Sequence, residues 1–304
     1  MLVAFATIAP IFLLIVTGFV LRRTGFFPTL SWPPIERITY YVLFPSLLFI
    51  NLATADLHDL PVGGMAVAVI GTPALMTLLL LAARPALPID GPGFTSLVQG
   101  AVRFNTYVGI PLVIAFYGQA SIALGALFIA FMVPFINVVS VWVLSRFGDG
   151  GASPLGAAKE MARNPLIIAC LLGIAVNLSG IGLAGPIETF FRLMSRAAPP
   201  VGLLCVGAGL DLAAAHAGKH WVGLTALLKL AGMPLIATAL AALLGIDGLS
   251  AKVLILFHAL PTAPSAYIMA RQLGGDARLI AGILTAQTAL AVVTLPLWIA
   301  ALGN

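Results

Sequence analysis

The chain has 304 residues, of which 61% are hydrophobic and 8% are charged, and its mean hydropathy is +1.11. A soluble globular domain carries roughly 25% charged residues, so the composition excludes such a domain and predicts an integral membrane protein embedded in the lipid bilayer. The net charge of +5 indicates membrane orientation rather than a nucleic-acid partner, because the lysines and arginines stand in short segments between apolar runs.

The first apolar run, residues 2–21, is followed by Arg22 and Arg23. A basic pair after the run is wrong for a cleaved signal peptide and typical of a first membrane helix whose far end is cytoplasmic. Cys170 and Cys205 lie in apolar segments without the spacing of a disulfide or a metal site. We expect no metal, no cofactor and no catalytic residue in this chain.

About twenty apolar residues cross the hydrocarbon core of a bilayer. On this rule the sequence predicts an all-α polytopic membrane protein with ten transmembrane helices, at residues 3–21, 35–55, 62–83, 94–117, 120–144, 165–183, 189–210, 221–244, 250–272 and 277–302.

The distribution of lysine and arginine favours one orientation, with the N- and C-termini outside the cytoplasm. On the outer side stand Arg192, Arg196 and Lys252. The connections predicted to be cytoplasmic hold or adjoin Arg22, Arg23, Arg37, Arg84, Arg146, Lys159, Arg163, Lys219, Arg271 and Arg278.

An internal repeat appears when the chain is compared with itself. Residues 1–144 and 165–304 each hold five predicted spans, joined by a cytoplasmic loop at 145–164. Because five is odd, the second repeat is expected to be inverted across the membrane. The residues that recur at a spacing of 155 are Pro10 and Pro165, Gly18 and Gly173, Gly25 and Gly180, Pro45 and Pro200, and Asp56 and Asp211, and Gly118 recurs as Gly274 at 156.

Proline interrupts the fourth and the ninth span. The fourth contains Gly109-Ile110-Pro111, and the ninth contains Pro261 and Pro264. A proline inside a helix removes one backbone hydrogen bond, and interrupted segments at matching places in two halves indicate a transporter's binding site. We therefore expect broken helices four and nine; simple proline kinks are the alternative.

Four stretches resemble the auxin efflux carrier family in its short bacterial form. They are Pro10-Ile11-Phe12 through Gly18 to Arg22-Arg23-Thr24-Gly25-Phe26, then Tyr41 to Phe49, then Asn105-Thr106 with Gly109 to Leu112 and Tyr117-Gly118, and finally Ala259-Leu260-Pro261 with Leu295-Pro296-Leu297. The resemblance covers essentially the whole chain. The long hydrophilic central loop of plant members has no counterpart in residues 145–164, and bacterial relatives are associated with malonate, malate and similar carboxylates.

This resemblance implies a fold and a mechanism. Helices 1, 2, 6 and 7 would form a scaffold that often dimerises, so a homodimer is a possible assembly. Helices 3–5 and 8–10 would form a transport domain that moves in an elevator-like manner, with the broken helices crossing at the substrate site. The resemblance also implies the bacterial inner membrane as the location.

An organic anion at mid-membrane needs compensation for its lost water. The N-termini of half-helices supply unpaired N–H groups and about half a positive charge, and we expect two such ends near Gly109 and Pro264. Asn105 and Thr106 lie beside one break, and Thr262 and Ser265 beside the other. These neutral donors are candidate substrate contacts; alternatively, they satisfy backbone groups or pack between helices.

Ionisable and amide side chains inside the spans form a second group of candidates. Arg103 is predicted near mid-membrane, as a carboxylate partner or gate, unless its helix starts later and it extends to the cytoplasmic interface. His258 is a candidate for proton coupling or a packing residue. Asn51, Asn137 and Gln287 are ligand contacts or links between helices, and the role of Lys229 is left open.

The sequence therefore predicts a secondary transporter for a small organic anion, a mono- or dicarboxylate, with a proton or sodium as a possible coupling ion. One alternative is a sodium- or proton-coupled ion antiporter or symporter of related fold, against which the lack of Asp or Glu near either break counts. A membrane-embedded receptor or interaction protein without transport is another.

Overall fold

The computed structural model describes residues 2–54, 62–149 and 165–303. Every regular element within these ranges is a helix, which confirms the all-α prediction. Most of the predicted cytoplasmic loop, with Lys159, Glu160 and Arg163, lies outside the described residues, as does Asp56 of the repeat.

Each predicted span corresponds to one helix or to a run of consecutive helices. The first half contains α1 (Leu2–Arg23), η1 (Thr29–Ser31), α2 (Trp32–Ile38), η2 (Thr39–Leu43), α3 (Phe44–Ala53), α4 (Val62–Ala83), η3 (Arg84–Ala86), α5 (Gly91–Val102), α6 (Thr106–Tyr117) and α7 (Ala120–Phe147). The second contains α9 (Pro165–Ser179), α10 (Gly185–Ala208), α11 (Leu212–Ala217), α12 (Lys219–Leu227), η4 (Leu228–Gly232), α13 (Met233–Leu243), α14 (Gly248–Ala259), α15 (Pro264–Leu273) and α16 (Ala277–Leu302).

Five helical stretches among the described residues are long and apolar enough to cross a membrane. A sixth candidate is the pair α14 and α15, which is bent by 45°. The chain is thus an integral membrane protein, while the count of ten spans stays a prediction. The five unbent stretches are Gly63–Ala86, Gly91–Tyr117, Ala120–Phe147, Lys219–Leu243 and Ala277–Leu302.

The chain divides into two compact units. Unit 1 comprises the described residues within 1–62, 106–130 and 162–209, and unit 2 those within 63–105, 131–161 and 210–304. Both α7 and the stretch formed by α5 and α6 contribute to the two units, because the boundaries fall inside them.

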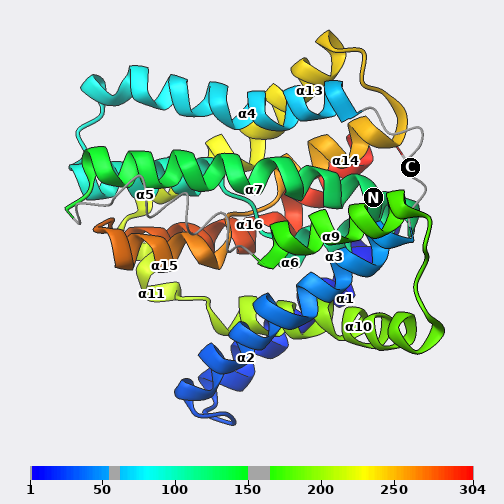
Figure 1. Ribbon diagram of the computed structural model, residues 1–304. Coiled ribbons are helices and arrows are strands. Elements are labelled where there is room, and N and C mark those ends of the chain that lie inside the picture. The colour runs from blue at the N-terminus through cyan, green and yellow to red at the C-terminus, as the bar shows by residue number, and fades with distance from the viewer. Residues whose placement is uncertain (1, 55–61, 150–164, 304) are drawn as a thin grey trace. The chain divides into compact units, whose positions relative to one another are not determined.

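Unit 1 is built on two close helix contacts, of α1 with α10 and of α3 with α9, which can be followed in Figure 1. A Cβ added to Gly18 would lie 2.0 Å from the Leu204 carbonyl oxygen, and one on Gly173 would lie 2.8 Å from the Phe49 carbonyl oxygen. Small residues let membrane helices approach this closely, since packing rather than hydrophobicity drives their association.

These two contacts repeat at the spacing found in the sequence. Gly18 and Gly173 are 155 residues apart, and so are their partners Phe49 and Leu204. The backbone repeats as well: Gly25 and Gly180 have φ angles of 71° and 66°, in the left-handed region that favours glycine. The agreement supports an internal repeat within unit 1.

Unit 2 is organised around α16, which packs against α5, α11, α12, α14 and α15. Gly100 of α5 allows one of these approaches, because a Cβ there would lie 2.7 Å from the Ile283 side chain and 2.8 Å from that of Thr225. The run from α12 through η4 to α13 is a single apolar stretch with a π-helical turn at Leu228–Gly232.

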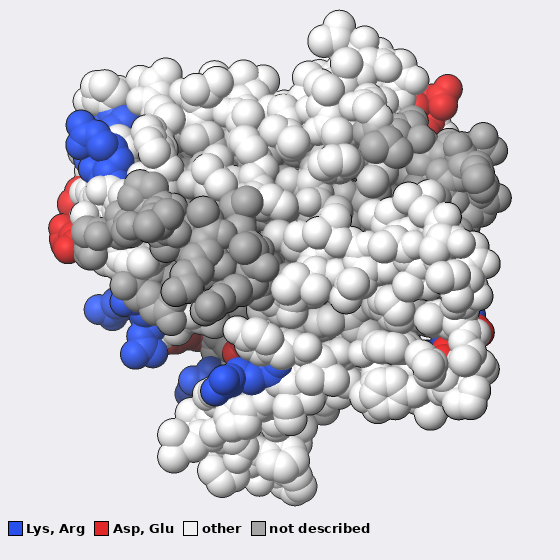
Figure 2. All heavy atoms as spheres, viewed as in Figure 1, with Lys and Arg blue, Asp and Glu red and all other residues white. Residues whose placement is uncertain are grey.

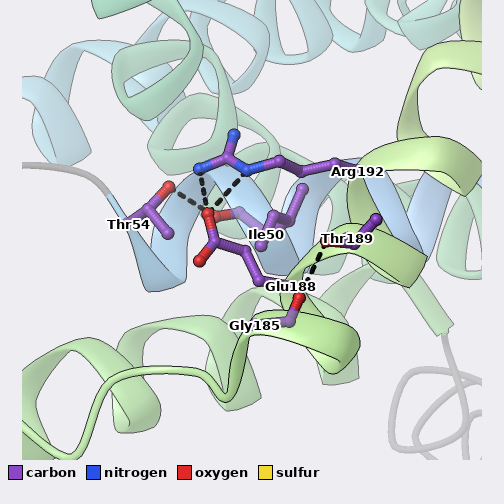
Figure 3. Close-up of polar contacts among 6 residues, drawn as sticks. All are labelled: Ile50, Thr54, Gly185, Glu188, Thr189 and Arg192. Carbon is purple, nitrogen blue, oxygen red and sulfur yellow. Dashed lines mark hydrogen bonds and ion pairs between the residues drawn. The ribbon is translucent and has the colours of Figure 1, made fainter.

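The helix surfaces are those of a lipid-facing protein. On the face seen in Figure 2 few atoms belong to charged residues, and large apolar side chains such as Leu13, Leu78 and Leu171 are more than half exposed. Several polar side chains of unit 1 bond within their own helix, as Figure 3 shows: Arg192 Nε and Nη2 lie 2.7 and 2.6 Å from Glu188 Oε1, and Thr54 donates to the Ile50 carbonyl at 2.8 Å.

We predict that Gly18→Ala and Gly173→Ala each lower the thermal midpoint of the detergent-purified protein, because the added methyl group collides with a backbone carbonyl. Overpacking of this kind costs about 1–3 kcal/mol. The matched control is Gly223→Ala in α12, whose added Cβ meets no atom within 4 Å. Equal midpoints for all three variants would show that the close contacts do not stabilise the fold.

Candidate functional site

The fourth predicted span is interrupted, but not where the sequence indicated. α5 ends at Val102, Arg103 has extended backbone angles (φ −72°, ψ 159°), and α6 begins at Thr106. The predicted break at Gly109-Ile110-Pro111 is wrong, because Gly109 and Pro111 lie inside α6. The physical reason is that one proline removes a single hydrogen bond, which a membrane helix can tolerate.

The ninth span is interrupted as predicted. α14 ends at Ala259, its C-cap residue Leu260 is extended (φ −65°, ψ 149°), and α15 begins at Pro264. Pro261 lies in the connecting segment and is buried, whereas Pro264 occupies the first helical position, where its missing N–H costs nothing. The breaks at 103–105 and 260–263 thus occupy matching places in the two halves.

Arg103 lies at the centre of the polar contacts near these breaks, with 6% of its surface exposed. Its Nη2 donates to Ser265 Oγ at 3.0 Å, in the first turn of α15. Its Nη1 contacts Ser140 Oγ at 3.0 Å and Asn137 Oδ1 at 3.2 Å, both on α7, and Met269 Sδ at 3.2 Å. All of these residues belong to unit 2, and all four contacted groups are neutral.

The start of α5 tests one premise of the sequence interpretations, that the helix begins later than Phe94. α5 begins at Gly91, earlier than predicted, so Arg103 follows twelve helical residues, or about 18 Å of helix. The alternative of a later helix start is therefore wrong. A buried guanidinium group needs polar surroundings, which α7 and α15 provide.

Helix dipoles act on this guanidinium group in opposite directions. Arg103 is the C-cap of α5, where the partial negative charge of the helix end favours a cation. It also contacts the first turn of α15, where the partial positive charge and the unpaired N–H groups favour an anion. The region between Arg103 and the start of α15 therefore lies between a guanidinium charge and the positive end of α15, while the negative end of α5 lies at the backbone of Arg103.

Gln287 of α16 joins the two breaks to the rest of unit 2. Its Oε1 accepts from the Thr262 N–H at 2.8 Å, and its Nε2 donates to the Gly100 carbonyl at 3.0 Å and to the Thr225 carbonyl at 3.3 Å. Of the two roles predicted for Gln287, the structure shows the link between helices. Thr262 donates in turn to the Gln99 carbonyl at 3.4 Å.

The remaining sequence candidates fall into different environments. Asn105 and His258 are buried in unit 2, with 1% and 0% of their surfaces exposed. Asn51 bonds within its own helix, donating to the Leu47 carbonyl at 2.7 Å. Thr106, Gly109 and Pro111 belong to α6 in unit 1, and their role in binding stays a prediction.

Three residues of this site escaped the sequence reasoning. Ser140 and Met269 contact Arg103 directly, and Gln99 is fully buried beside Gly100. Ser140 was the easiest to find, since it follows the candidate Asn137 by three residues and such pairs share a helix face. Gln99 and Met269 carry no comparable signal, because their proximity depends on how separate helices pack.

A separate pocket of about 440 Å³ lies at the starts of α5 and α16. Asp90 and Asp276 line it, but both carboxylates cap helices: Asp90 accepts from the Gly93 N–H at 2.8 Å, and Asp276 from the Leu279 N–H at 2.9 Å. No residue of either break lines this pocket, so it is not the predicted site.

Comparison with known proteins decides the class. Residues 156–299 match the model of a family described as membrane transport protein. An uncharacterized transporter of Methanothermobacter thermautotrophicus is 26% identical over 297 residues, covering 96% of each chain. Another, of Methanocaldococcus jannaschii, is 22% identical over 306 residues, covering 95% of each chain.

These matches support a transporter. The resemblance to the auxin efflux carrier family is confirmed, and with it the prediction that the protein is not an enzyme. The relatives align over nearly the whole length of the chain, which includes the two breaks and the residues around Arg103.

We predict that Gln287→Leu destabilises the transport protein, because it leaves the Thr262 N–H and two carbonyl groups without their partner. Each buried group left unsatisfied costs about 1–3 kcal/mol. The thermal midpoint in detergent measures this loss. Gln119→Leu, at an exposed position between α6 and α7, is the control and should change little. A Gln287→Leu protein as stable as the wild type would contradict the assigned link.

Proposed function

We propose that this protein is a secondary transporter that moves a small organic anion, a mono- or dicarboxylate, across the membrane by alternating access. The substrate's carboxylate binds where Arg103 meets the start of α15, at the breaks of spans four and nine. The proposal is supported most by the 3.0 Å contact of Arg103 Nη2 with Ser265 Oγ, which places a buried cation at the positive end of a helix.

The electrostatics of this contact favour an anion as the substrate. A guanidinium group costs at least about 2.5 kcal/mol at the centre of a membrane helix on insertion scales. The oxygens of Ser140, Asn137 and Ser265 accept hydrogen bonds from its Nη1 and Nη2 groups, and these three oxygens carry no charge. A bound carboxylate both accepts hydrogen bonds and neutralises the charge, through the paired hydrogen bonds that the guanidinium group makes with carboxylates.

Neutral side chains at the breaks supply further contacts for the anion. Asn105 is buried at the end of the first break, and its amide N–H₂ group is a donor of the kind that a carboxylate needs. Thr262 and Ser265 bear hydroxyl groups at the second break. Since these residues are uncharged, they orient the anion without holding it so tightly that release becomes slow.

We also propose the ten-helix inverted repeat that the sequence predicts. The recurrence of the Gly18–Leu204 contact as Gly173–Phe49 and the matching breaks of spans four and nine support it. In the elevator-like mechanism, unit 2 carries the substrate, because it contains Arg103 and the four residues named above that Arg103 contacts, and unit 1 is the scaffold. A homodimer through the scaffold belongs to the same proposal.

The coupling and the location complete the proposal. A proton or sodium ion drives transport across the bacterial inner membrane, with both termini outside the cytoplasm. His258, fully buried in the last turn of α14, is the candidate for proton coupling. An ion carrier without an organic substrate is the competing outcome, in which sodium or proton flux proceeds in liposomes that hold no carboxylate.

We predict that Arg103→Gln abolishes or reduces by at least tenfold the uptake of carboxylates into proteoliposomes, since it removes the charge that compensates the anion. Uptake of labelled acetate, lactate, malonate and malate is measured across imposed pH and sodium gradients. The control is Arg271→Gln, which removes an exposed arginine from the opposite end of α15. Wild-type liposomes that transport none of these anions would refute the proposed function.

We predict that Asn105→Ala raises the KM for the transported carboxylate more than it lowers the maximal rate, because the lost amide contact weakens binding and leaves the charge in place. The same proteoliposome assay gives both constants. Asn51→Ala is the matched control, because Asn51 bonds only to its own helix among the contacts seen for it. An unchanged KM would remove Asn105 from the site.

A further inference from the structure

Lys229 is a second cation in the interior of unit 2. It lies in the π-helical turn η4, ten residues after Lys219 at the start of the apolar stretch Lys219–Leu243. At about 1.5 Å per residue it is about 15 Å from that start, half the thickness of a core of about 30 Å. π-Turns inside helices are frequent at functional sites.

The surroundings of Lys229 do not satisfy its ammonium group. The side chain is 0% exposed, and no residue that the structure describes forms a hydrogen bond with Nζ. A lysine near the membrane interface extends its chain toward water, which this one does not. An ammonium group has three donors and no acceptor capacity, so what is missing is an acceptor.

Two other buried polar side chains belong to the same part of unit 2. His258 of α14 is 0% exposed, and α14 packs against η4, the turn that holds Lys229. Gln99 of α5 is also 0% exposed, and neither its amide nitrogen nor its amide oxygen has a hydrogen-bond partner among the described residues.

Packing brings these elements together. Gln287 bonds at once to the carbonyl groups of Gly100 and Thr225, and Gly100 packs on the Thr225 side chain. Gln99 precedes Gly100, and Lys229 follows Thr225 by one helical turn. The turn η4 also packs against α5, α14 and α16. Lys229, Gln99 and His258 thus lie on three elements around one junction.

The chemistry of Lys229, Gln99 and His258 indicates which class of ligand they could bind. A metal ion is repelled by the ammonium group, and no cluster of metal-binding side chains occurs among the residues described. A neutral ligand would leave the buried charge in place. An anion with oxygen acceptors satisfies the ammonium donors, neutralises the charge and accepts from the Gln99 amide.

We propose that Lys229, with Gln99 and His258 beside it, forms an anion-binding position of unit 2 that is distinct from the contacts of Arg103 and takes a carboxylate group. This inference rests on the proposed function for the chemical class of the ligand. Lys229 then acts as a specificity-determining residue: it adds a fixed positive charge that must be matched by the anionic cargo.

The decisive experiment compares Lys229→Met with the wild type in detergent, with sodium malonate, sodium acetate or sodium chloride as the probe. Methionine has a similar length and no charge, and removing an unpartnered buried ion is often neutral or stabilising. We expect a thermal midpoint without carboxylate at or above that of the wild type. We expect at least a tenfold increase in the carboxylate concentration that gives half of the stabilisation.

Lys219→Met is the matched control, because it removes an exposed lysine from the start of the same apolar stretch. It should keep the wild-type response to malonate and acetate. Chloride distinguishes a carboxylate site from a site for any small anion: stabilisation of the wild type by chloride alone, at the same concentration as by acetate, would overturn the carboxylate assignment.

The outcomes separate this inference from the proposed function. A wild type that none of the three probes stabilises and that transports no carboxylate would overturn both. A wild type stabilised by carboxylate, together with an equal response in Lys229→Met, would overturn the role of Lys229 and leave the transporter proposal intact. If Lys229→Met does not fold, Lys229→Gln decides: it removes the charge and keeps a polar side chain, so unchanged affinities for both malonate and acetate would refute the inference.

Discussion

The structure of unit 2 depends on how a guanidinium group is accommodated inside an apolar protein. Arg103 ends one half-helix and contacts the beginning of another, so the two chain breaks and the charge form one arrangement. A continuous helix at either position would satisfy more backbone groups. The breaks are stabilised by side-chain hydrogen bonds. Gln287 accepts from the Thr262 N–H in one break, and Asn137 and Ser140 of α7 accept from the Arg103 guanidinium group in the other.

Lys229 extends the same constraint. Lys229 is buried in the same unit, and its ammonium group has no hydrogen-bond partner among the described residues. If an anion binds there as proposed, it neutralises this buried charge and stabilises the conformation that holds it. Unit 1 differs in kind: its contacts are glycine-mediated approaches of helices, and its exposed ion pair, Arg192 with Glu188, lies within one helix.

Much of the helical arrangement was predictable from local signals. Apolar runs of about twenty residues located the helices, and Pro264 marked the start of α15. The break in span four was predicted at the wrong residues because Pro111 is a strong local signal for a helix break. In the structure Pro111 lies inside α6 without ending it. The break lies instead at Arg103, where side chains on distant segments make an unwound turn tolerable.

The sequence by itself determined the membrane class, the places of the helices and the recurrence of glycine and proline at 155 residues, because these depend on composition and spacing along the chain. Only the tertiary structure decided which polar residues share an environment. Arg103 lies 162 residues from Ser265 along the chain, and Gln287 lies 187 from Gly100. Such contacts depend on how helices pack against one another, which no local pattern encodes.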